Sequence, residues 1–315
     1  MIRSKRILES LAAAAMIVAL SACAGGGGSG GGDALGGNIP VSDDPQYADD
    51  GTKLADAPDG TEFPLLQTQG YYANGGGKIT GEPGARKASI TPLADGMRLK
   101  VENFMDVEFR DGSHRTVKNG VVTYTKNVSG REVVLQLYGV LAGLDYMELG
   151  AWAISNGGPT DLEVGIGVGV GGYETRPSDM PTSGTATYTG KMVGVAVDST
   201  GDAYDLLGNA AMTADFGSGN VSGNFTGTTA TNVETLASSP WNDVNFGGTI
   251  AAGSNDFSGT TSVGGANTNP GGLADDASGV VGGKFFGPGA DEAGGAWTLE
   301  DSSGNVATGA FGVTQ

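Results

Sequence analysis

The chain has 315 residues and carries 17 Lys and Arg against 35 Asp and Glu, which gives a formal net charge of −18 at pH 7. An acidic surface of that size repels phosphate backbones, so nucleic acid is excluded as a partner. The 58 glycines are mostly interleaved with Thr, Val, Phe and Tyr. That pattern favours short strands joined by tight turns.

The first residues have the layout of a secretory signal peptide that ends at the only cysteine of the chain. A basic start is followed by the apolar stretch Leu11–Leu20, which is too short to span a bilayer comfortably, and then by small residues. Leu20-Ser21-Ala22-Cys23 resembles a bacterial lipobox, which implies cleavage before Cys23 and diacylation of its thiol. The alternatives are an ordinary signal peptide with an incidental cysteine and an uncleaved transmembrane anchor.

A lipid anchor at Cys23 predicts where the protein is located. Ala24 is not the aspartate that retains many lipoproteins of Gram-negative bacteria in the inner membrane. We therefore expect a lipid-anchored protein of the outer membrane, exposed at the cell surface. We assign residues 1–22 to the signal peptide and residues 23–60 to the lipidated cysteine and a flexible, mostly disordered Gly-rich tether. A lone cysteine also forms no disulfide within the chain.

Residues 61–175 are predicted to form a first, β-rich domain. Its clearest predicted strands are Met97–Glu102, Phe104–Arg110, Val121–Lys126, Arg131–Gly139 and Leu144–Ser155. Val133, Leu135 and Leu137 recur at every second residue, which is the period of a strand. We predict no capped amphipathic helix in this domain, and we interpret Tyr71–Lys78 as a mobile loop that carries two aromatic side chains.

Residues 176–315 contain eight predicted strands, which we expect to close into a small antiparallel barrel filled by its own side chains. The predicted strands are Thr185–Val197, Gly208–Phe216, Val221–Thr226, Val244–Ala251, Asp256–Thr261, Ser278–Phe286, Ala293–Glu300 and Val306–Val313. Aromatic residues occur at about one to a strand, Trp297 among them, and are expected in the core. A membrane barrel is disfavoured because the strands are short and rich in Gly, Thr and Asn. The predicted fold class is all-β.

Four motifs of this second region resemble the β-barrel domain of transferrin-binding protein B-like surface lipoproteins. They are the opening segment Asp179–Gly190, the hairpin Ala214–Gly223, the Gly-, Phe- and Pro-containing signature Gly283–Gly295 and the closing strand segment Gly309–Gly312. The tract 147–172 is similar to the end of the family's handle domain. The resemblance implies that residues 61–175 form a β-rich handle domain and that residues 176–315 form a closed eight-stranded β-barrel domain.

The residues that carry chemistry in enzymes do not form a catalytic pattern in this sequence. His114 is the only histidine and lies in Arg110–Arg115, which we interpret as a polar hairpin turn, so metal sites built on paired histidines are excluded. Glu292 precedes two glycines and is interpreted as a structural carboxylate that accepts backbone N–H groups of a turn, in preference to an acid at a binding or catalytic site. We expect no enzyme, no metal and no resident cofactor.

The resemblance implies nutrient capture, because family members bind iron-carrying proteins, haem or haem proteins and pass the iron to an outer-membrane transporter. Well-studied transferrin binders have two handle-and-barrel lobes and this chain has room for one, so transferrin itself is disfavoured. The alternative is a surface lipoprotein that binds a host regulatory protein or acts as a structural coat. If the ligand is haem, we expect His114, Tyr71 or Tyr72 to bind its iron. The simpler alternative is that these three side chains are solvated.

Overall fold

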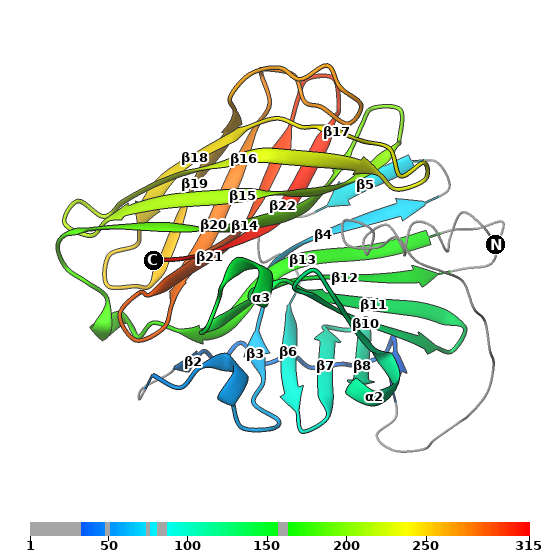
Figure 1. Cartoon of the computed structure of the whole chain (residues 1–315), viewed down its shortest axis with the longest axis horizontal. Helices are drawn as coiled ribbons and strands as arrows, with labels where there is room; N and C mark the ends of the chain where they lie inside the picture. Colours follow the sequence, from blue (N-terminus) through cyan, green and yellow to red (C-terminus); the bar gives the residue numbers. More distant parts are fainter. Residues whose placement is uncertain (1–32, 48–50, 74–75, 81–86, 157–162) are drawn as a thin grey trace.

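The computed structural model, which describes residues 33–47, 51–73, 76–80, 87–156 and 163–315, has three β layers (Figure 1). The small sheet contains, in spatial order, β1 (Ala34–Leu35), β8 (Met105–Arg110), β7 (Gly96–Val101), β6 (Ala88–Leu93) and β3 (Phe63–Pro64). The large sheet contains β9 (Arg115–Lys118), β10 (Val121–Val128), β11 (Arg131–Leu137), β12 (Met147–Asn156), β13 (Glu163–Glu174), β4 (Leu66–Ala73) and β5 (Gly76–Thr80). We call these two antiparallel sheets together the handle.

The third layer is a closed antiparallel barrel. Its strands are β14 (Thr185–Val197), β15 (Ala203–Asp215), β16 (Asn220–Asn232), β18 (Val244–Ile250), β19 (Asp256–Val263), β20 (Ser278–Phe286), β21 (Glu292–Glu300) and β22 (Val306–Thr314). The barrel closes because β14 pairs with β22, from Thr189 with Thr314 to Val197 with Val306. All eight predicted strands are confirmed, and the all-β fold class with them.

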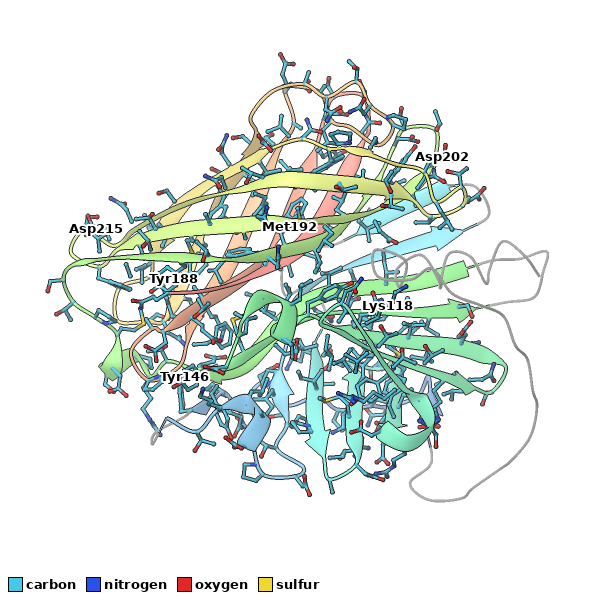
Figure 2. All side chains as sticks on the ribbon, viewed as in Figure 1. Lys118, Tyr146, Tyr188, Met192, Asp202 and Asp215 are labelled. Carbon is cyan, nitrogen blue, oxygen red and sulfur yellow. The ribbon has the colours of Figure 1, made fainter. Side chains whose placement is uncertain are left out.

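Short elements complete the fold. β17 (Ser238–Pro240) extends the pairing of β16, and β2 (Gln46–Tyr47) runs parallel to the end of β13. The remaining described elements are the single helical turns η2 (Leu54–Asp56), α2 (Asp111–His114), α3 (Gly139–Ala142) and η3 (Pro177–Asp179). Asp202 and Asp215, which flank β15, lie at opposite ends of the barrel (Figure 2). Within the described ranges, none of the helices has the length and apolar character needed to cross a membrane.

The barrel interior is filled by large side chains, as the sequence predicts. Trp297, Phe225 and Phe311 are fully buried, and the ring of Phe225 lies 5.5 Å from that of Trp297 and 5.3 Å from that of Phe311 between centroids. Phe216 is the exception among the predicted core aromatics, because it lies at one end of the barrel and is only half-buried. The closed ring of strands thus encloses a packed core rather than a channel.

The large sheet is covered on both faces. Val133, Leu135 and Leu137 of β11 pack against the small sheet, whereas Val134 packs against the barrel residues Val195 and Val197. A strand buried on both faces loses the alternation of apolar and polar residues that a half-buried strand shows. The large sheet is therefore the central layer of the molecule.

Close packing explains why β13 is rich in glycine. A Cβ atom at Gly167 would lie 2.3 Å from Nε1 of Trp152, and one at Gly169 would lie 2.6 Å from Cβ of Gln67. Trp152 Nε1 donates a hydrogen bond of 2.9 Å to Gln67 Oε1 across this surface. Glycine at these positions lets the indole and the amide lie flat against the strand.

Two predictions about the N-terminal half are wrong. The segment from Asp33 to residue 60 was expected to be tether, yet Ala34 pairs with Asp106 and Ile39 is 6% exposed, so its described part packs on the handle. Tyr71–Lys78 was expected to be a loop, but Tyr71 lies in β4 and pairs with Gly165 of β13 and Lys78 of β5. Both segments gain their order from strand partners far away in the sequence.

Replacing Trp297 with alanine tests the barrel core. The side chain is 0% exposed, so Trp297→Ala leaves a large cavity and should lower the free energy of unfolding by about 3–5 kcal/mol. Urea unfolding followed by circular dichroism measures the change. Thr260→Ala on the exposed face of β19 is the control and should change the stability by less than about 0.5 kcal/mol. Equal losses in the two variants would place Trp297 outside the core.

Candidate functional site

The handle meets the barrel along an apolar interface that includes several charged groups. Val193, Phe286 and Ala310 of the barrel pack against Met147 and Leu149 of β12. Glu174, at the end of β13, accepts hydrogen bonds from Lys284 Nζ (2.7 Å) and Asn255 Nδ2 (3.1 Å) of the barrel. We call this interface the handle–barrel joint.

Glu292 joins the barrel to the handle through backbone amides. The side chain begins β21, is 1% exposed and accepts hydrogen bonds from the N–H groups of Asp145, Tyr146 (3.1 Å) and Met147 (3.0 Å). Tyr146 lies at the joint in Figure 2. The prediction that Glu292 is a structural carboxylate that binds backbone amides is thus confirmed, but the amides are not those of an exposed turn beside it. They belong to the handle, more than 140 residues away in the sequence.

A second carboxylate supports the same handle segment. Glu148 accepts a hydrogen bond from the N–H of Gly139, the first residue of α3. Burial raises the pKa of Glu148 and of Glu292 to about 7 each, against the opposing effect of the backbone N–H donors. The negative charge of Glu292 also raises the pKa of Glu148. The joint therefore places two acidic groups around the stretch from α3 to the start of β12.

Asp205 is the third acidic group near this interface. It lies on β15 and is 5% exposed, and among the described residues neither of its carboxylate oxygens has a hydrogen-bond partner. Burial raises its pKa well above the usual value of an aspartate. Burial, and then the negative charge of Asp205, raise the pKa of Tyr138, whose hydroxyl donates a hydrogen bond of 2.8 Å to Gln136 Oε1.

The predicted ligand residues are not brought together. Cys23 lies outside the described residues. Tyr71 and Tyr72 lie on β4 in the large sheet, and their backbones pair with Gly165 and Val164. His114 ends α2, where its ring lies 6.4 Å from that of Phe109 between centroids. The two tyrosines and the histidine thus occupy separate elements, and the helical turn α2 replaces the hairpin turn predicted for Arg110–Arg115.

The hydrogen bonding of His114 disfavours iron binding. Its Nδ1 accepts a hydrogen bond of 2.8 Å from the backbone N–H of Arg110, so the neutral ring carries its proton on Nε2. Binding iron through Nε2 would require the proton to move to Nδ1, where it would face the N–H of Arg110. Burial, and then the positive charge of Lys126, lower the pKa of His114. A neutral histidine that caps a strand end is the simplest account of this residue.

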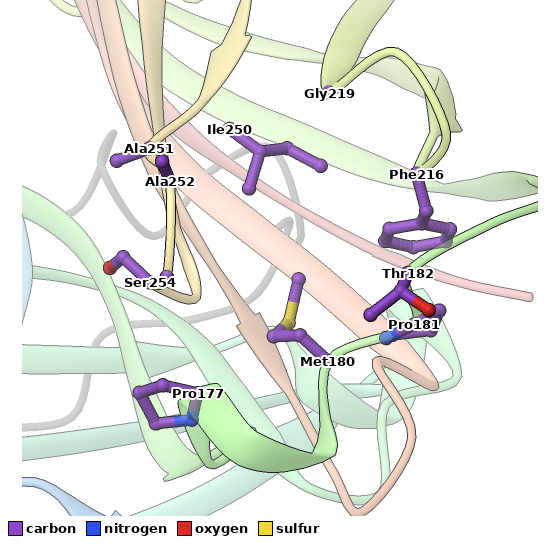
Figure 3. A pocket seen from close by; sticks show the side chains of 11 residues that line it. Pro177, Met180, Pro181, Thr182, Phe216, Gly219, Ile250, Ala251, Ala252 and Ser254 are labelled. Carbon is purple, nitrogen blue, oxygen red and sulfur yellow. The ribbon is translucent and has the colours of Figure 1, made fainter.

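A pocket lies at the barrel end that carries Asp215. It has a volume of about 260 Å³ and is lined by the linker before β14, the β15–β16 turn and the β18–β19 turn. Met180, Phe216 and Ile250 line it, one from each of these three segments (Figure 3). We call it the barrel-end pocket. It was not predicted, because its apolar side chains come from three distant segments. The sequence signal that could have revealed the pocket is the presence of apolar residues at the ends of strands.

The described part of the chain offers no metal centre. Within it, no group of three His, Cys, Asp or Glu side chains lies together in a way that would hold a metal ion. The barrel-end pocket is open to solvent and is lined by residues of three segments. The described chain is thus a single lobe, made of a two-sheet handle packed on a closed eight-stranded barrel.

Comparison with known proteins identifies the kind of lobe. Residues 180–315 match the family model described as the C-lobe and N-lobe β-barrels of transferrin-binding protein B, so this part of the chain is similar to those barrels. The resemblance seen in the sequence is confirmed. The proteins of that family are binding proteins rather than enzymes.

Solved structures agree on the fold. Two variants of transferrin-binding protein B from Haemophilus parasuis Hp5 match with TM-scores of 0.51 and 0.50, at 17% and 18% sequence identity. Each match covers 79% of this chain and 45% of the solved chain, so this chain spans less than half the length of those proteins. A search of curated proteins found no match.

Removing the carboxylate of Glu292 should weaken the handle–barrel joint. Glu292→Ala leaves the N–H groups of Asp145, Tyr146 and Met147 without their acceptor, and should cost on the order of 3 kcal/mol of stability. Hydrogen exchange at these three amides should accelerate more than exchange inside the barrel. Glu300→Ala, at the exposed end of the same strand, is the matched control. Unchanged exchange at the three amides in Glu292→Ala would contradict the role of Glu292.

Asp205 should make the stability of the protein depend on pH. Because the folded state raises the pKa of this acid, its contribution favours folding most below the unfolded pKa of about 4 and is lost as the pH rises through the folded value. Asp205→Asn does not titrate, so its stability relative to the wild type should increase between pH 4.5 and pH 8. Urea unfolding at the two pH values measures this, with the exposed Asp202→Asn as control. Parallel pH profiles for wild type and Asp205→Asn would refute it.

Proposed function

We propose that the chain is a surface-exposed lipoprotein of the outer membrane that captures an iron-carrying protein or haem for nutrient acquisition. The observation that carries the proposal is the similarity of the barrel in residues 180–315 to those of transferrin-binding protein B, together with the two-sheet handle that precedes it. An outer-membrane transporter is the proposed acceptor of the iron. The described residues favour capture of a protein over capture of haem, because the hydrogen bond from Arg110 engages His114.

The place where the chain enters the fold supports an anchor at Cys23. The first described strand, β1, pairs with β8 at the edge of the small sheet, across the large sheet from the barrel (Figure 1). A tether from Ala24 to Gly32 spans at most about 30 Å. Lipidation of Cys23 would therefore hold the handle next to the membrane and direct the barrel away from it. This orientation leaves the barrel available to a ligand in the medium.

The anchor is tested by replacing the cysteine. Cys23→Ala removes the thiol that would be acylated, so labelling of the protein by a palmitate analogue in cells should fall to background, and the precursor should stay uncleaved or be misplaced. Ser21→Ala, which leaves the cysteine in place, should be labelled like the wild type. Full processing and labelling of Cys23→Ala would refute the anchor.

The ligand is tested by capture and by titration. Immobilised protein that begins at Ala24 should retain an iron-carrying or haem protein from host serum or growth medium. It should retain more of this ligand when a membrane extract that contains the cells' own transporter is added. Retention of a host regulatory protein, or of nothing, would favour the alternative of a regulator-binding or coat protein.

Binding of free haem is tested separately, by a titration that follows the Soret band of the haem. A saturable shift that persists in His114→Ala and is lost when Tyr71 and Tyr72 are both changed to Phe would assign haem to β4, and no shift would eliminate haem.

A further inference from the structure

The barrel-end pocket is preformed, because hydrogen bonds tie its three walls to one another. The N–H of Phe216 donates to the carbonyl of Gly184 (2.9 Å), which joins the β15–β16 turn to the linker. The N–H of Ile250 donates to the carbonyl of Gly219 (2.7 Å), which joins the same turn to β18. The ring of Phe216 is held 5.5 Å from that of Phe285 between centroids. A ligand that enters such a pocket orders little of the protein, which favours binding.

The lining of the pocket is apolar and uncharged. Met180, Phe216 and Ile250 are half-buried, although the barrel buries most of its other large apolar side chains. No charged side chain lines the pocket, and the hydroxyls of Thr182 and Ser254 are the polar side-chain groups among the lining residues. A volume of about 260 Å³ accommodates one bulky apolar side chain.

Acidic residues outnumber basic ones beside the lining residues in the sequence, and the one basic neighbour, Arg176 before Pro177, lies with its guanidinium 4.5 Å from the centroid of the Tyr47 ring. Asp179 precedes Met180, Asp215 precedes Phe216 and Asp256 follows Ser254 by two residues. Residues 177–315 contain 14 acidic residues and only two basic ones, Lys191 and Lys284. Lys284 is already engaged by Glu174 at 2.7 Å and Asp256 at 3.6 Å. The mouth of the pocket therefore attracts cations and repels anions.

We propose that the barrel-end pocket binds a bulky apolar side chain of a partner protein, carried on a segment whose neighbouring residues are Lys or Arg. The apolar lining receives the side chain, and the acidic surroundings select the basic segment that presents it. Fatty acids fit the lining but carry a carboxylate, which the flanking acids repel. A second copy of this chain is disfavoured for the same reason, because its net charge of −18 opposes self-association.

Short peptides of defined charge test the proposal on the protein that begins at Ala24. The probes are acetyl-Lys-Lys-Phe-Lys-Lys-amide, the same peptide with Ala in place of Phe, and acetyl-Glu-Glu-Phe-Glu-Glu-amide, each titrated by calorimetry. The basic Phe peptide should bind at least about tenfold more tightly than either of the others. Its affinity should fall at about 1 M salt, where charges are screened beyond about 3 Å. Equal affinities for the three peptides, tighter binding of decanoate, or no binding at millimolar peptide would overturn the proposal.

Two variants locate the site. Ala252→Trp fills the pocket from the β18–β19 turn and should abolish the preference for the basic Phe peptide, and Thr182→Trp should do the same from the linker. Ala237→Trp places the same side chain on an exposed turn of the barrel and should leave binding unchanged. Near-ultraviolet circular dichroism checks that each filled variant is folded. If both folded variants bind the basic Phe peptide like the wild type, the peptide binds outside this pocket.

This inference rests on the proposed function only in taking the ligand to be a protein. The experiments can refute the pocket as the binding site and the nutrient role independently of each other. If the immobilised chain captures a serum protein and Ala252→Trp captures it equally well, the pocket is not the contact and capture stands. If the basic Phe peptide binds at the pocket but no nutrient protein is captured, the pocket stands and the nutrient role fails.

Discussion

Two-sided burial of the large sheet is the constraint on which the rest of the molecule depends. Its strands carry apolar side chains toward both the small sheet and the barrel. Without the handle, the barrel would expose Val193, Phe286 and Ala310 to water, an apolar patch that soluble domains seldom leave open. Handle and barrel therefore shield each other's apolar surfaces from water.

Apolar contact holds the two parts together, and directional bonds set how they fit. Hydrophobic burial has no preferred orientation, so it does not by itself fix which residues of the two surfaces meet. The three amide hydrogen bonds to Glu292 and the contacts of Glu174 with Lys284 and Asn255 supply that specificity at two separated points. Each needs a particular carboxylate to reach a particular backbone or side-chain group, which a slipped arrangement would not satisfy.

The sequence predicted the barrel better than the handle, for a physical reason. Each barrel strand pairs with a strand near it in the sequence, and most of the connections are short, so strand pattern and Gly-rich turns are both local signals. In the handle, Ala34 and Tyr71 pair with partners roughly 70 to 90 residues away. Tyr71 also lies in the local β4–β5 hairpin, whose Gly-rich sequence resembles a loop. Glu292 was recognised as a carboxylate suited to backbone amides, whereas its partner turn was not readable from the sequence. The barrel-end pocket was missed because it assembles from three distant strand ends.

The scarcity of basic residues in the barrel has a consequence for proteolysis. Trypsin-like proteases cleave after Lys or Arg, and in residues 177–315 only Lys191 and Lys284 qualify. Lys191 lies within β14, where its neighbours on both sides are β15 and β22, and Lys284 lies within β20 and is engaged by Glu174. Strand backbone paired on both sides does not fit a protease cleft without local unfolding, whereas the exposed turns, which would fit, contain no cleavage residue. The barrel thus withstands enzymes of this specificity through its composition as much as through its stability.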